Sequence, residues 1–371
     1  MSPITIIMLS FSMLGAVDLI IGNKLGLGKE FERGIHLLGV MVMSMVGMIV
    51  FAPLIAHLLR PVIEWVCSVL PIEPSVIPSM ILANDMGGAP LAMEFATNEE
   101  VGYFNGLIVS AMMGVTISFT LTCAMGVVHK EKHDSLLLGL LCGIVTTPIG
   151  ALVSGLICAL PIKDLLASVI PLLLFAGLIA TALFLAPNAC LKVFKVFGAI
   201  IKIIILVGLA VGIFEALTGW DIIPYTAPIQ EGFDICTGAA MVLSGAFPLV
   251  YVLKKLLDKP MRKAGEKIGI NATAAIGLLS ILATSATAFG NMKDMDEKGA
   301  MLNSAFSVSA AYVLGSHLAF TMSFNSSYVL SMMIGKLVAG IASIFVAMLL
   351  YKMLHTNKET VTTSVEEPLE V

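Results

Sequence analysis

Apolar runs long enough to cross a bilayer as helices limit most strongly how this chain can fold. About 20 consecutive apolar residues are needed to span the hydrocarbon core of a membrane. Nine uninterrupted runs reach this length, at 3–22, 35–59, 101–128, 135–160, 165–187, 196–218, 233–256, 300–324 and 327–351. Two further apolar stretches, 74–97 and 271–292, are interrupted. Because the runs are continuous rather than alternating, they predict an all-α polytopic membrane protein and not a β-barrel.

Composition agrees with this class and argues against others. Charged residues make up 12% of the 371 residues, against about 25% in a soluble domain. The sequence has no basic stripe for nucleic acid, and its six cysteines form no Cys-x-x-Cys or Cys/His cluster. It also has no nucleophile elbow, phosphate-binding loop or His-Glu-x-x-His pattern. We therefore expect a lipid bilayer as surroundings, no nucleic-acid partner, no cofactor or metal, and no catalytic residues.

The chain repeats itself after about 200 residues. Met41-Val42-Met43-Ser44 recurs as Met241-Val242-Leu243-Ser244, and Ile81-Leu82-Ala83 recurs as Ile281-Leu282-Ala283. Such duplications are frequent in transporters, whose site lies at the repeat interface near the bilayer midplane. The expected organisation is a first transmembrane repeat at 1–162, a connecting transmembrane helix at 163–188, a second repeat at 189–353 and a disordered cytoplasmic tail at 354–371.

Loop charges predict how the two repeats are oriented. Basic residues mark the cytoplasmic side, and they gather at 24–33, 130–132, 192–195 and 254–267, whereas 220–232 and 325–327 contain none. All four basic segments lie on the cytoplasmic side only if neither interrupted stretch crosses the membrane. Stretch 74–97 would then enter and leave from outside, and stretch 271–292 from inside. We therefore predict two inverted repeats of about 160 residues, each with a re-entrant or broken helical hairpin. The N-terminus would lie outside and the C-terminus inside. Spanning broken helices remain the alternative for both stretches.

The stretch Asn84-Asp85-Met86-Gly87-Gly88 interrupts 74–97 at its middle. A carboxylate in bilayer hydrocarbon is costly, so Asp85 must face protein, water or a ligand. Broken backbone at membrane depth is tolerated only where it is buried in protein or lines a cavity. No Lys or Arg lies in the same stretch, so we expect an uncompensated anion that binds a small cation. The structural alternative is a kinked helix whose Asp makes a buried hydrogen bond.

Other polar residues in or beside the apolar stretches are candidates for the same site. The tip of 271–292 supplies hydroxyls without a second carboxylate, and Pro148 frees a helix carbonyl near two threonines. Each candidate also has a structural interpretation, such as helix packing, a solvated turn or a satisfied core histidine. Besides Asp85, the predicted substrate-binding residues are Asn84, Glu94, Thr146, Thr147, Ser285, Asp296, Asn303 and His317.

Four motifs occur in the order typical of a known family. They are Asp85-Met86-Gly87-Gly88, the segment 143–150, Met292-Lys293-Asp294-Met295-Asp296, and Ser309-Ala310-Ala311 followed by Gly315-Ser316-His317-Leu318. With them the chain resembles the EutH family, the ethanolamine permeases of bacterial ethanolamine-utilisation operons, from its first span to about Tyr351. The resemblance implies a multi-pass protein of the bacterial cytoplasmic membrane that admits ethanolamine for an ammonia-lyase pathway housed in a microcompartment.

The residues suit that substrate. Ethanolamine is a primary amine, mostly protonated near neutral pH as lysine is. It needs one anion, which Asp85 supplies, together with acceptors for its N–H groups and a partner for its hydroxyl. The alternatives are a transporter of another polar solute, such as a nucleoside or an amino acid, and an intramembrane enzyme or sensor. The sequence leaves open whether the protein forms a homo-oligomer and whether H⁺ or Na⁺ is coupled to transport.

Overall fold

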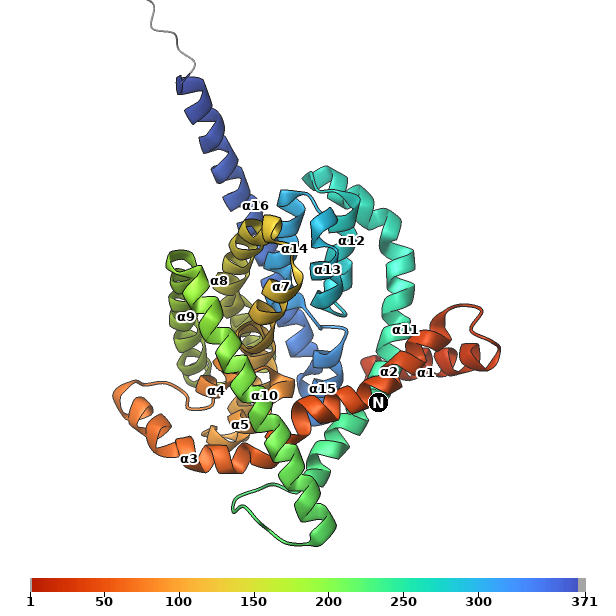
Figure 1. Cartoon of the computed structure of the whole chain (residues 1–371), viewed down its shortest axis with the longest axis vertical. Coiled ribbons are helices and arrows are strands. Elements are labelled where there is room, and N and C mark those ends of the chain that lie inside the picture. The colour runs from red at the N-terminus through yellow and green to blue at the C-terminus, as the bar shows by residue number, and fades with distance from the viewer. Residues whose placement is uncertain (1, 366–371) are drawn as a thin grey trace, which may run out of the picture.

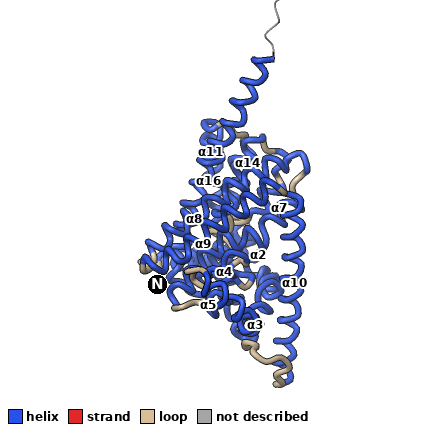
Figure 2. The backbone as a smooth tube through the Cα atoms, turned by 90° about the vertical axis from the view of Figure 1, so that its left-hand side faces the viewer, coloured by secondary structure: helices blue, strands red, loops and turns tan. Residues whose placement is uncertain are grey.

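The computed structural model describes residues 2–365, with side chains up to Leu354, and this part of the chain contains helices but no strand (Figure 2). Eight helical segments within it are long and apolar enough to cross a membrane. The predicted all-α membrane class is therefore confirmed. α16 continues to Val365, into the predicted tail, while 366–371 of that tail lie outside the described residues.

The first half of the chain alternates long helices with short broken ones. Its α-helices are α1 (Pro3–Ile20), α2 (Leu27–Met41), α3 (Gly47–Val69), α4 (Val76–Ile81), α5 (Gly88–Phe95), α6 (Glu99–Phe104), α7 (Leu121–Val127) and α8 (His133–Ile157). The π-helical turns Val42–Val46 join α2 to α3, and Asn105–Gly114 and Thr116–Thr120 continue α6 towards α7. Single 3₁₀ turns lie at Asn84–Met86 and Lys130–Lys132.

The second half begins after α9 (Ile162–Leu185), the predicted connecting helix. Its α-helices are α10 (Pro187–Thr218), α11 (Ile229–Ile268), α12 (Ala272–Ile281), α13 (Ser285–Gly290), α14 (Glu297–Ala310), α15 (Ser316–Asn325) and α16 (Val329–Val365). Single 3₁₀ turns lie at Met292–Asp294 and Ser326–Tyr328.

The predicted continuous span at 300–324 is wrong, because the helix is broken between α14 and α15. Tyr312 has a left-handed backbone with φ +63°. The N–H groups of Tyr312 and Leu314 donate to the carbonyls of Ile281 and Leu282 at 3.1 and 2.7 Å. Those carbonyls belong to the end of α12, where the second interrupted stretch unwinds. The two breaks therefore satisfy each other's backbone groups, which buried polar backbone requires.

Both interrupted stretches are broken where the sequence predicts. α4 packs on α5 and α12 packs on α13. A polar clamp joins the ends of the first stretch, since the Glu73 carboxylate accepts hydrogen bonds from the N–H and hydroxyl of Thr97 at 3.0 and 2.8 Å. The second has a similar clamp, in which the N–H of Asn271 donates to the Asp296 carboxylate at 2.8 Å. The base of each broken stretch is thus fixed by hydrogen bonds.

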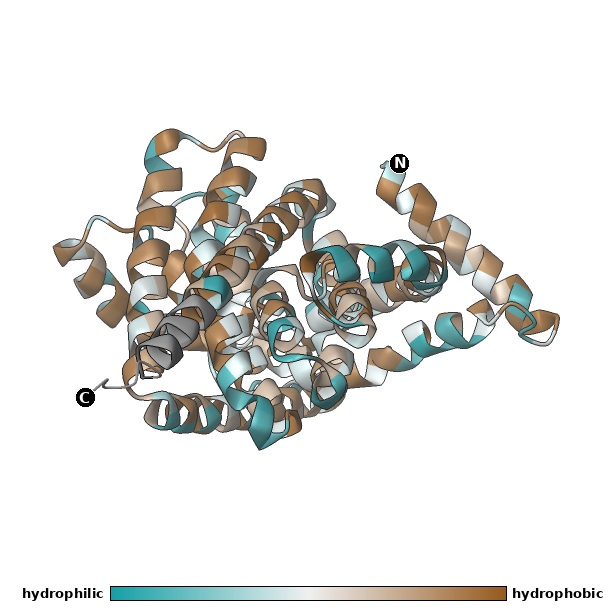
Figure 3. Ribbon diagram, turned by 90° about the horizontal axis from the view of Figure 1, so that it is seen from above, coloured by the Kyte–Doolittle hydropathy of each residue, from teal (hydrophilic) through white to brown (hydrophobic). Residues whose placement is uncertain are grey.

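The most deeply buried elements form the centre of the bundle. All ten residues of Asn105–Gly114 are buried, and this segment contacts α4, α5, α8, α14 and α16. In Figure 1, α14 and α16 lie in the middle, with α9 and α10 on one side and the α1–α2 pair on the other. The outer helices expose apolar side chains such as Leu174 and Leu217, and Figure 3 shows that hydrophobic residues predominate along most of the helices. An apolar outside and a partly polar centre suit a helical bundle in lipid.

Candidate functional site

Asp85 lies in the 3₁₀ turn between α4 and α5, and two glycines shape that turn. Gly87 has φ +106°, a left-handed conformation that favours glycine. A Cβ atom on Gly88 would lie 2.3 Å from the Ser110 hydroxyl oxygen and 2.4 Å from the Leu82 carbonyl oxygen. The glycines therefore allow the chain to turn tightly and α5 to start against the central segment Asn105–Gly114.

The neighbouring π-helical segments hold the tip in place. The Ser118 hydroxyl donates to the Gly114 carbonyl at 2.8 Å and accepts from the Ala83 N–H at 3.1 Å. A Cβ atom on Gly114 would lie 2.0 Å from the Leu82 carbonyl oxygen. Single turns of π-helix inside α-helices are frequent at functional sites. Here they bring Gly114 and Ser118 against the broken backbone that precedes Asp85.

Asp85 is an acid deep in the bundle, and the residue is intermediate in exposure. Its turn packs on α15, and its carboxyl group is influenced by Ser316, in the first turn of α15, and by the charge of Lys336 on α16. A carboxylate is stabilised near a helix N-terminus. Ion pairs within 4.0 Å among the described side chains are Arg33–Glu30 and Arg262–Asp258, so Asp85 has no direct ion-pair partner there.

Lys336 and His317 form a buried pair beside this acid. The Lys336 ammonium group donates to the Ala111 carbonyl, and its Nζ lies 3.1 Å from His317 Nδ1. The His317 ring is 5.1 Å from the ring of Tyr312, whose hydroxyl is 2.8 Å from the Ser285 hydroxyl. Breaks from both halves thus converge here. We call Asp85, Tyr312, Ser316, His317 and Lys336 the Asp85 centre.

Several buried polar atoms close to this centre have no hydrogen-bond partner among the described residues. Both the oxygen and the nitrogen of the Asn84 amide are unpaired although Asn84 is fully buried. The hydroxyls of Ser110 and Thr321 are also unpaired. Leaving such a group unpaired costs about 1–3 kcal/mol. A polar solute that reached these atoms would therefore gain hydrogen bonds that the protein leaves unmade.

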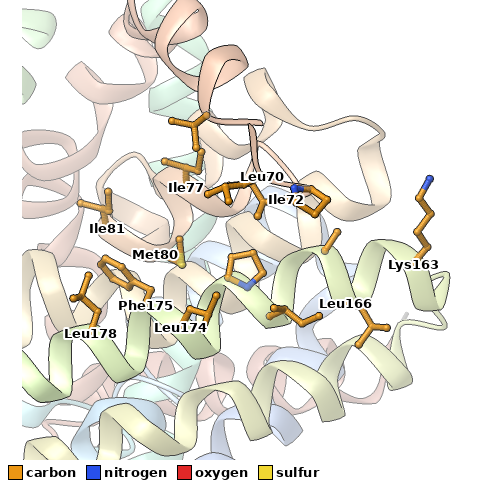
Figure 4. Close-up of a pocket in the computed structure, with 15 residues that line it drawn as sticks. Leu70, Ile72, Ile77, Met80, Ile81, Lys163, Leu166, Leu174, Phe175 and Leu178 are labelled. Carbon is orange, nitrogen blue, oxygen red and sulfur yellow. The ribbon is translucent and has the colours of Figure 1, made fainter. Parts of the chain in front are cut away.

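A surface groove leads towards the Asp85 centre. Its volume is about 920 Å³, and its wall includes Met86, next to Asp85, and Phe119. The Phe119 ring lies 6.4 Å from that of Tyr312. A second groove, of about 740 Å³, lies among α3, α4 and α9 and is lined almost wholly by apolar side chains such as Met80 and Phe175 (Figure 4). The second groove suits lipid chains, whereas the first borders the turn that carries Asp85 and includes Ser44, Ser118 and Lys202 in its wall.

Other predicted site residues lie elsewhere. Thr146 and Thr147 donate to carbonyls of their own helix, those of Gly143 and Ile144. Asn303 donates hydrogen bonds to the Ala274 and Gly299 carbonyls. Asp296 is the N-cap residue of α14, and Glu94 is exposed. In the part of the chain with described side chains, none of these hydrogen-bonds to the Asp85 centre. The residues that the structure does bring to it are Asn84, Ser285 and His317.

Lys336 was missed by the sequence reasoning, and its position corrects one expectation. Asp85 was expected to be an uncompensated anion because its own apolar stretch contains no Lys or Arg. The structure brings a cation from α16, far along the chain. A lone lysine within the apolar run 327–351 is an available signal, because intramembrane ionisable residues are functional by default. Tyr312 and Ser316 had no comparable signal, since the chain break that exposes them depends on tertiary contacts.

Comparison with known proteins gives consistent matches over almost the whole chain. The sequence family described as "Ethanolamine utilisation protein, EutH" matches residues 2–350. A protein of Listeria monocytogenes named "Probable ethanolamine permease EutH" is 42% identical, with 97% of each chain covered. A protein of the same name from Salmonella typhimurium is 35% identical, over 93% of this chain and 94% of its own. No solved structure matches significantly.

Proposed function

Because this chain belongs to the EutH family of ethanolamine utilisation proteins, we propose that it carries ethanolamine across the membrane as the ammonium ion, with Asp85 as its counter-ion. The relatives from Listeria monocytogenes and Salmonella typhimurium are named probable ethanolamine permeases, so the protein is a transporter rather than an enzyme. Its eight long apolar helices agree with a multi-pass bacterial membrane protein.

The observation that carries the proposal is that Asp85 has no direct ion pair. The acid lies deep in the bundle, the residue as a whole is intermediate in exposure, and the ion pairs among the described residues do not include it. A small cation can therefore approach it without displacing a bonded partner. Hydrogen bonds to a charged group contribute about 1.5–3 kcal/mol each. The ammonium group of ethanolamine would donate to Asp85 and the Ser316 hydroxyl.

The hydroxyl end of the substrate needs a partner two carbons away. The Asn84 amide precedes Asp85 in the same turn and has an unpaired donor and an unpaired acceptor. A substrate hydroxyl can use both, because it donates one hydrogen bond and accepts others. A simple alkylamine of the same length would leave that amide unpaired. Asn84 would therefore distinguish ethanolamine from ethylamine or propylamine.

The transport mechanism that we propose uses the two broken stretches as re-entrant hairpins of inverted repeats. The Glu73 and Asn271 clamps occupy corresponding places at their bases, and Asn98 and Asp296 both cap the following helix. Matching features in the two halves support a symmetric rearrangement around a fixed site. The Asp85 centre, where both halves meet, is that site, and the 920 Å³ groove is one access path.

A second candidate function follows from Lys336. A small zwitterionic amino acid would place its ammonium group on Asp85 and its carboxylate on Lys336, whose charge acts on the same site. Competition decides between the two substrates. Excess ethanolamine, but not glycine or alanine, should abolish uptake of labelled ethanolamine if the first proposal is correct. Equal competition by glycine would favour the second.

Counterflow in proteoliposomes tests the proposed function. Vesicles containing purified protein and loaded with unlabelled ethanolamine should transiently accumulate labelled ethanolamine from outside. Asp85→Asn should lose this exchange. Glu64→Gln, which changes an exposed carboxylate on α3, is the matched control and should exchange as the wild type does. Absence of counterflow in the wild type would contradict the proposal.

A further inference from the structure

Lys336 is the most unusual charged residue of the described part of the chain. Its side chain is 0% exposed, near the start of α16, which begins at Val329. Its nitrogen bonds to the Ala111 carbonyl and His317, and neither partner is an anion. Burying an ammonium group costs several kcal/mol unless it is compensated. Asp85 is the acid whose charge acts favourably on it, although the two form no contact within 4.0 Å.

The titratable and hydrogen-bonding groups around Lys336 can be assigned element by element. The turn Asn84–Met86 contributes Asp85, α15 contributes His317, and the central segment Asn105–Gly114 contributes the Ala111 carbonyl. The acids at the start of α14 act on Tyr351. Tyr351 lies fifteen residues further along α16 than Lys336, which is about 22 Å at 1.5 Å per residue. The remaining titratable groups of α8 and α14, which also pack on α16, are His133, Asp134 and Cys142, and Glu297 and Lys298.

A charge balance follows from this arrangement. With Asp85 ionised and Lys336 protonated, the empty centre has no net charge. Adding an ethanolammonium ion would leave one uncompensated positive charge in the protein interior, which is strongly unfavourable. Loss of one proton from the centre restores neutrality. His317 cannot serve as the compensating anion, because imidazole is neutral or positive.

We propose that protonated Lys336 balances the charge of Asp85 in the empty site. When ethanolammonium binds at Asp85, the substrate takes over this role and Lys336 releases its proton. This inference rests on the proposed function of Asp85. In the step, one Nζ–H bond breaks, the electron pair remains on Nζ, and the proton passes to water on the side to which the site is open. His317 Nδ1, 3.1 Å away, is the adjacent acceptor for the departing proton. The neutral amine keeps its bond to Ala111.

The exchange determines the charge moved in a transport cycle. Substrate binding on one side releases a proton there, and substrate release on the other side takes a proton up. In each cycle one ethanolammonium ion crosses the membrane in one direction and one proton crosses in the other. The net result is the transfer of one neutral ethanolamine molecule. Transport should therefore be electroneutral, insensitive to membrane potential, and directed towards accumulation on the more acidic side.

Proton release upon binding tests the proposal in the purified full-length protein. Ethanolamine titrated into a weakly buffered solution at neutral pH, with a pH-sensitive dye, should release about one proton per molecule bound, as charge compensation requires. Lys336→Met should bind ethanolamine without releasing protons. Lys298→Met is the matched control, because Lys298 also donates to a backbone carbonyl, that of Ile268, but lies at the start of α14. It should release protons as the wild type does.

The outcomes separate this inference from the proposed function. Binding without proton release in the wild type would overturn the role of Lys336, and so would undiminished release in Lys336→Met, because the proton would then come from another group, such as Asp85 or the substrate. Neither result would affect Asp85 as the counter-ion. A wild type that does not bind ethanolamine would instead contradict the proposed function.

A measurement on the wild type covers the case in which Lys336→Met does not fold. Proteoliposomes adsorbed to a solid-supported electrode should give no sustained transport current when ethanolamine is added at constant pH. Uptake into vesicles should also be unchanged when valinomycin and a potassium gradient impose an inside-negative potential. A sustained inward current of positive charge, or acceleration by the potential, would overturn the proposal.

Discussion

His317 Nδ1 lies 3.1 Å from Lys336 Nζ, and this contact joins the broken helix α15 to the last long helix α16 next to Asp85. A protonated imidazole here would place a second cation beside Lys336. Ethanolamine uptake should therefore fall at acid pH, because like charges disfavour substrate binding at Asp85. His317→Gln keeps a hydrogen-bonding side chain but cannot titrate, so it should make the acid limb of the uptake profile shallower and leave the part that arises from proton release by Lys336. An unchanged acid limb in a folded His317→Gln would limit His317 to a structural role.

The close approach of Gly114 to the Leu82 carbonyl should make this glycine essential. Gly114→Ala would place a Cβ atom 2.0 Å from that backbone oxygen, so either the central segment or the Asp85 tip must move. We expect a loss of about 1–3 kcal/mol of stability, typical of overpacking in a filled core, and reduced ethanolamine binding. Gly126→Ala is the control, because a Cβ atom there meets nothing within 4 Å. Equal melting temperatures of the two variants would refute the role of this contact.

Glu73 should stabilise the base of the first broken stretch without affecting the substrate directly. It is buried and accepts hydrogen bonds from Ser75 and from two groups of Thr97. Glu73→Ala would leave these donors unpaired, at a cost of about 1–3 kcal/mol for a buried group. The Tm should fall while the folded fraction still binds ethanolamine, which thermal unfolding and ligand titration measure. Glu64→Ala, at an exposed acid of α3, should stay within about 0.5 kcal/mol of the wild type.

The topology inferred from loop charges can be tested with single cysteines in a cysteine-free background. Ser327→Cys lies in an exposed loop without basic residues, whereas Arg262→Cys lies in the basic end of α11. The positive-inside rule predicts that an impermeant thiol reagent added to intact cells labels the first and spares the second. Labelling of Arg262→Cys from outside would reverse the orientation of the second half.

Local features of the sequence predict much of the fold. The apolar runs locate eight long helices, and the Gly87-Gly88 pair locates the break beside Asp85, because bilayer length and glycine geometry act within single segments. The break at Tyr312 escapes prediction, because Ala311 to Leu314 give no sequence signal for a break and the hydrogen bonds to Ile281 and Leu282 that help to stabilise the unwound backbone come from distant residues.

The site is predictable only in part for the same reason. Asp85, Asn84 and His317 stand out as polar residues in apolar surroundings. Asn303 and Thr146 have the same appearance in sequence, but they bond to backbone carbonyls in the structure. The partners of a buried polar side chain depend on the fold: Thr146 bonds to a carbonyl of its own helix, whereas the Asn303 amide also reaches the carbonyl of Ala274 on α12. The same is true of the pairing of Lys336 with His317 and of its action on Asp85.

The binding of ethanolamine by purified Asp85→Asn tests the central claim most directly. The substitution keeps the size of the side chain and its hydrogen bonding but removes the charge. Loss of a charge-assisted hydrogen bond worth about 1.5–3 kcal/mol should weaken binding roughly 10- to 100-fold. The Tm of the empty protein should be retained, because Asp85 has no direct ion pair among the described residues. Wild-type affinity in a folded Asp85→Asn would contradict the assignment of Asp85 as the counter-ion.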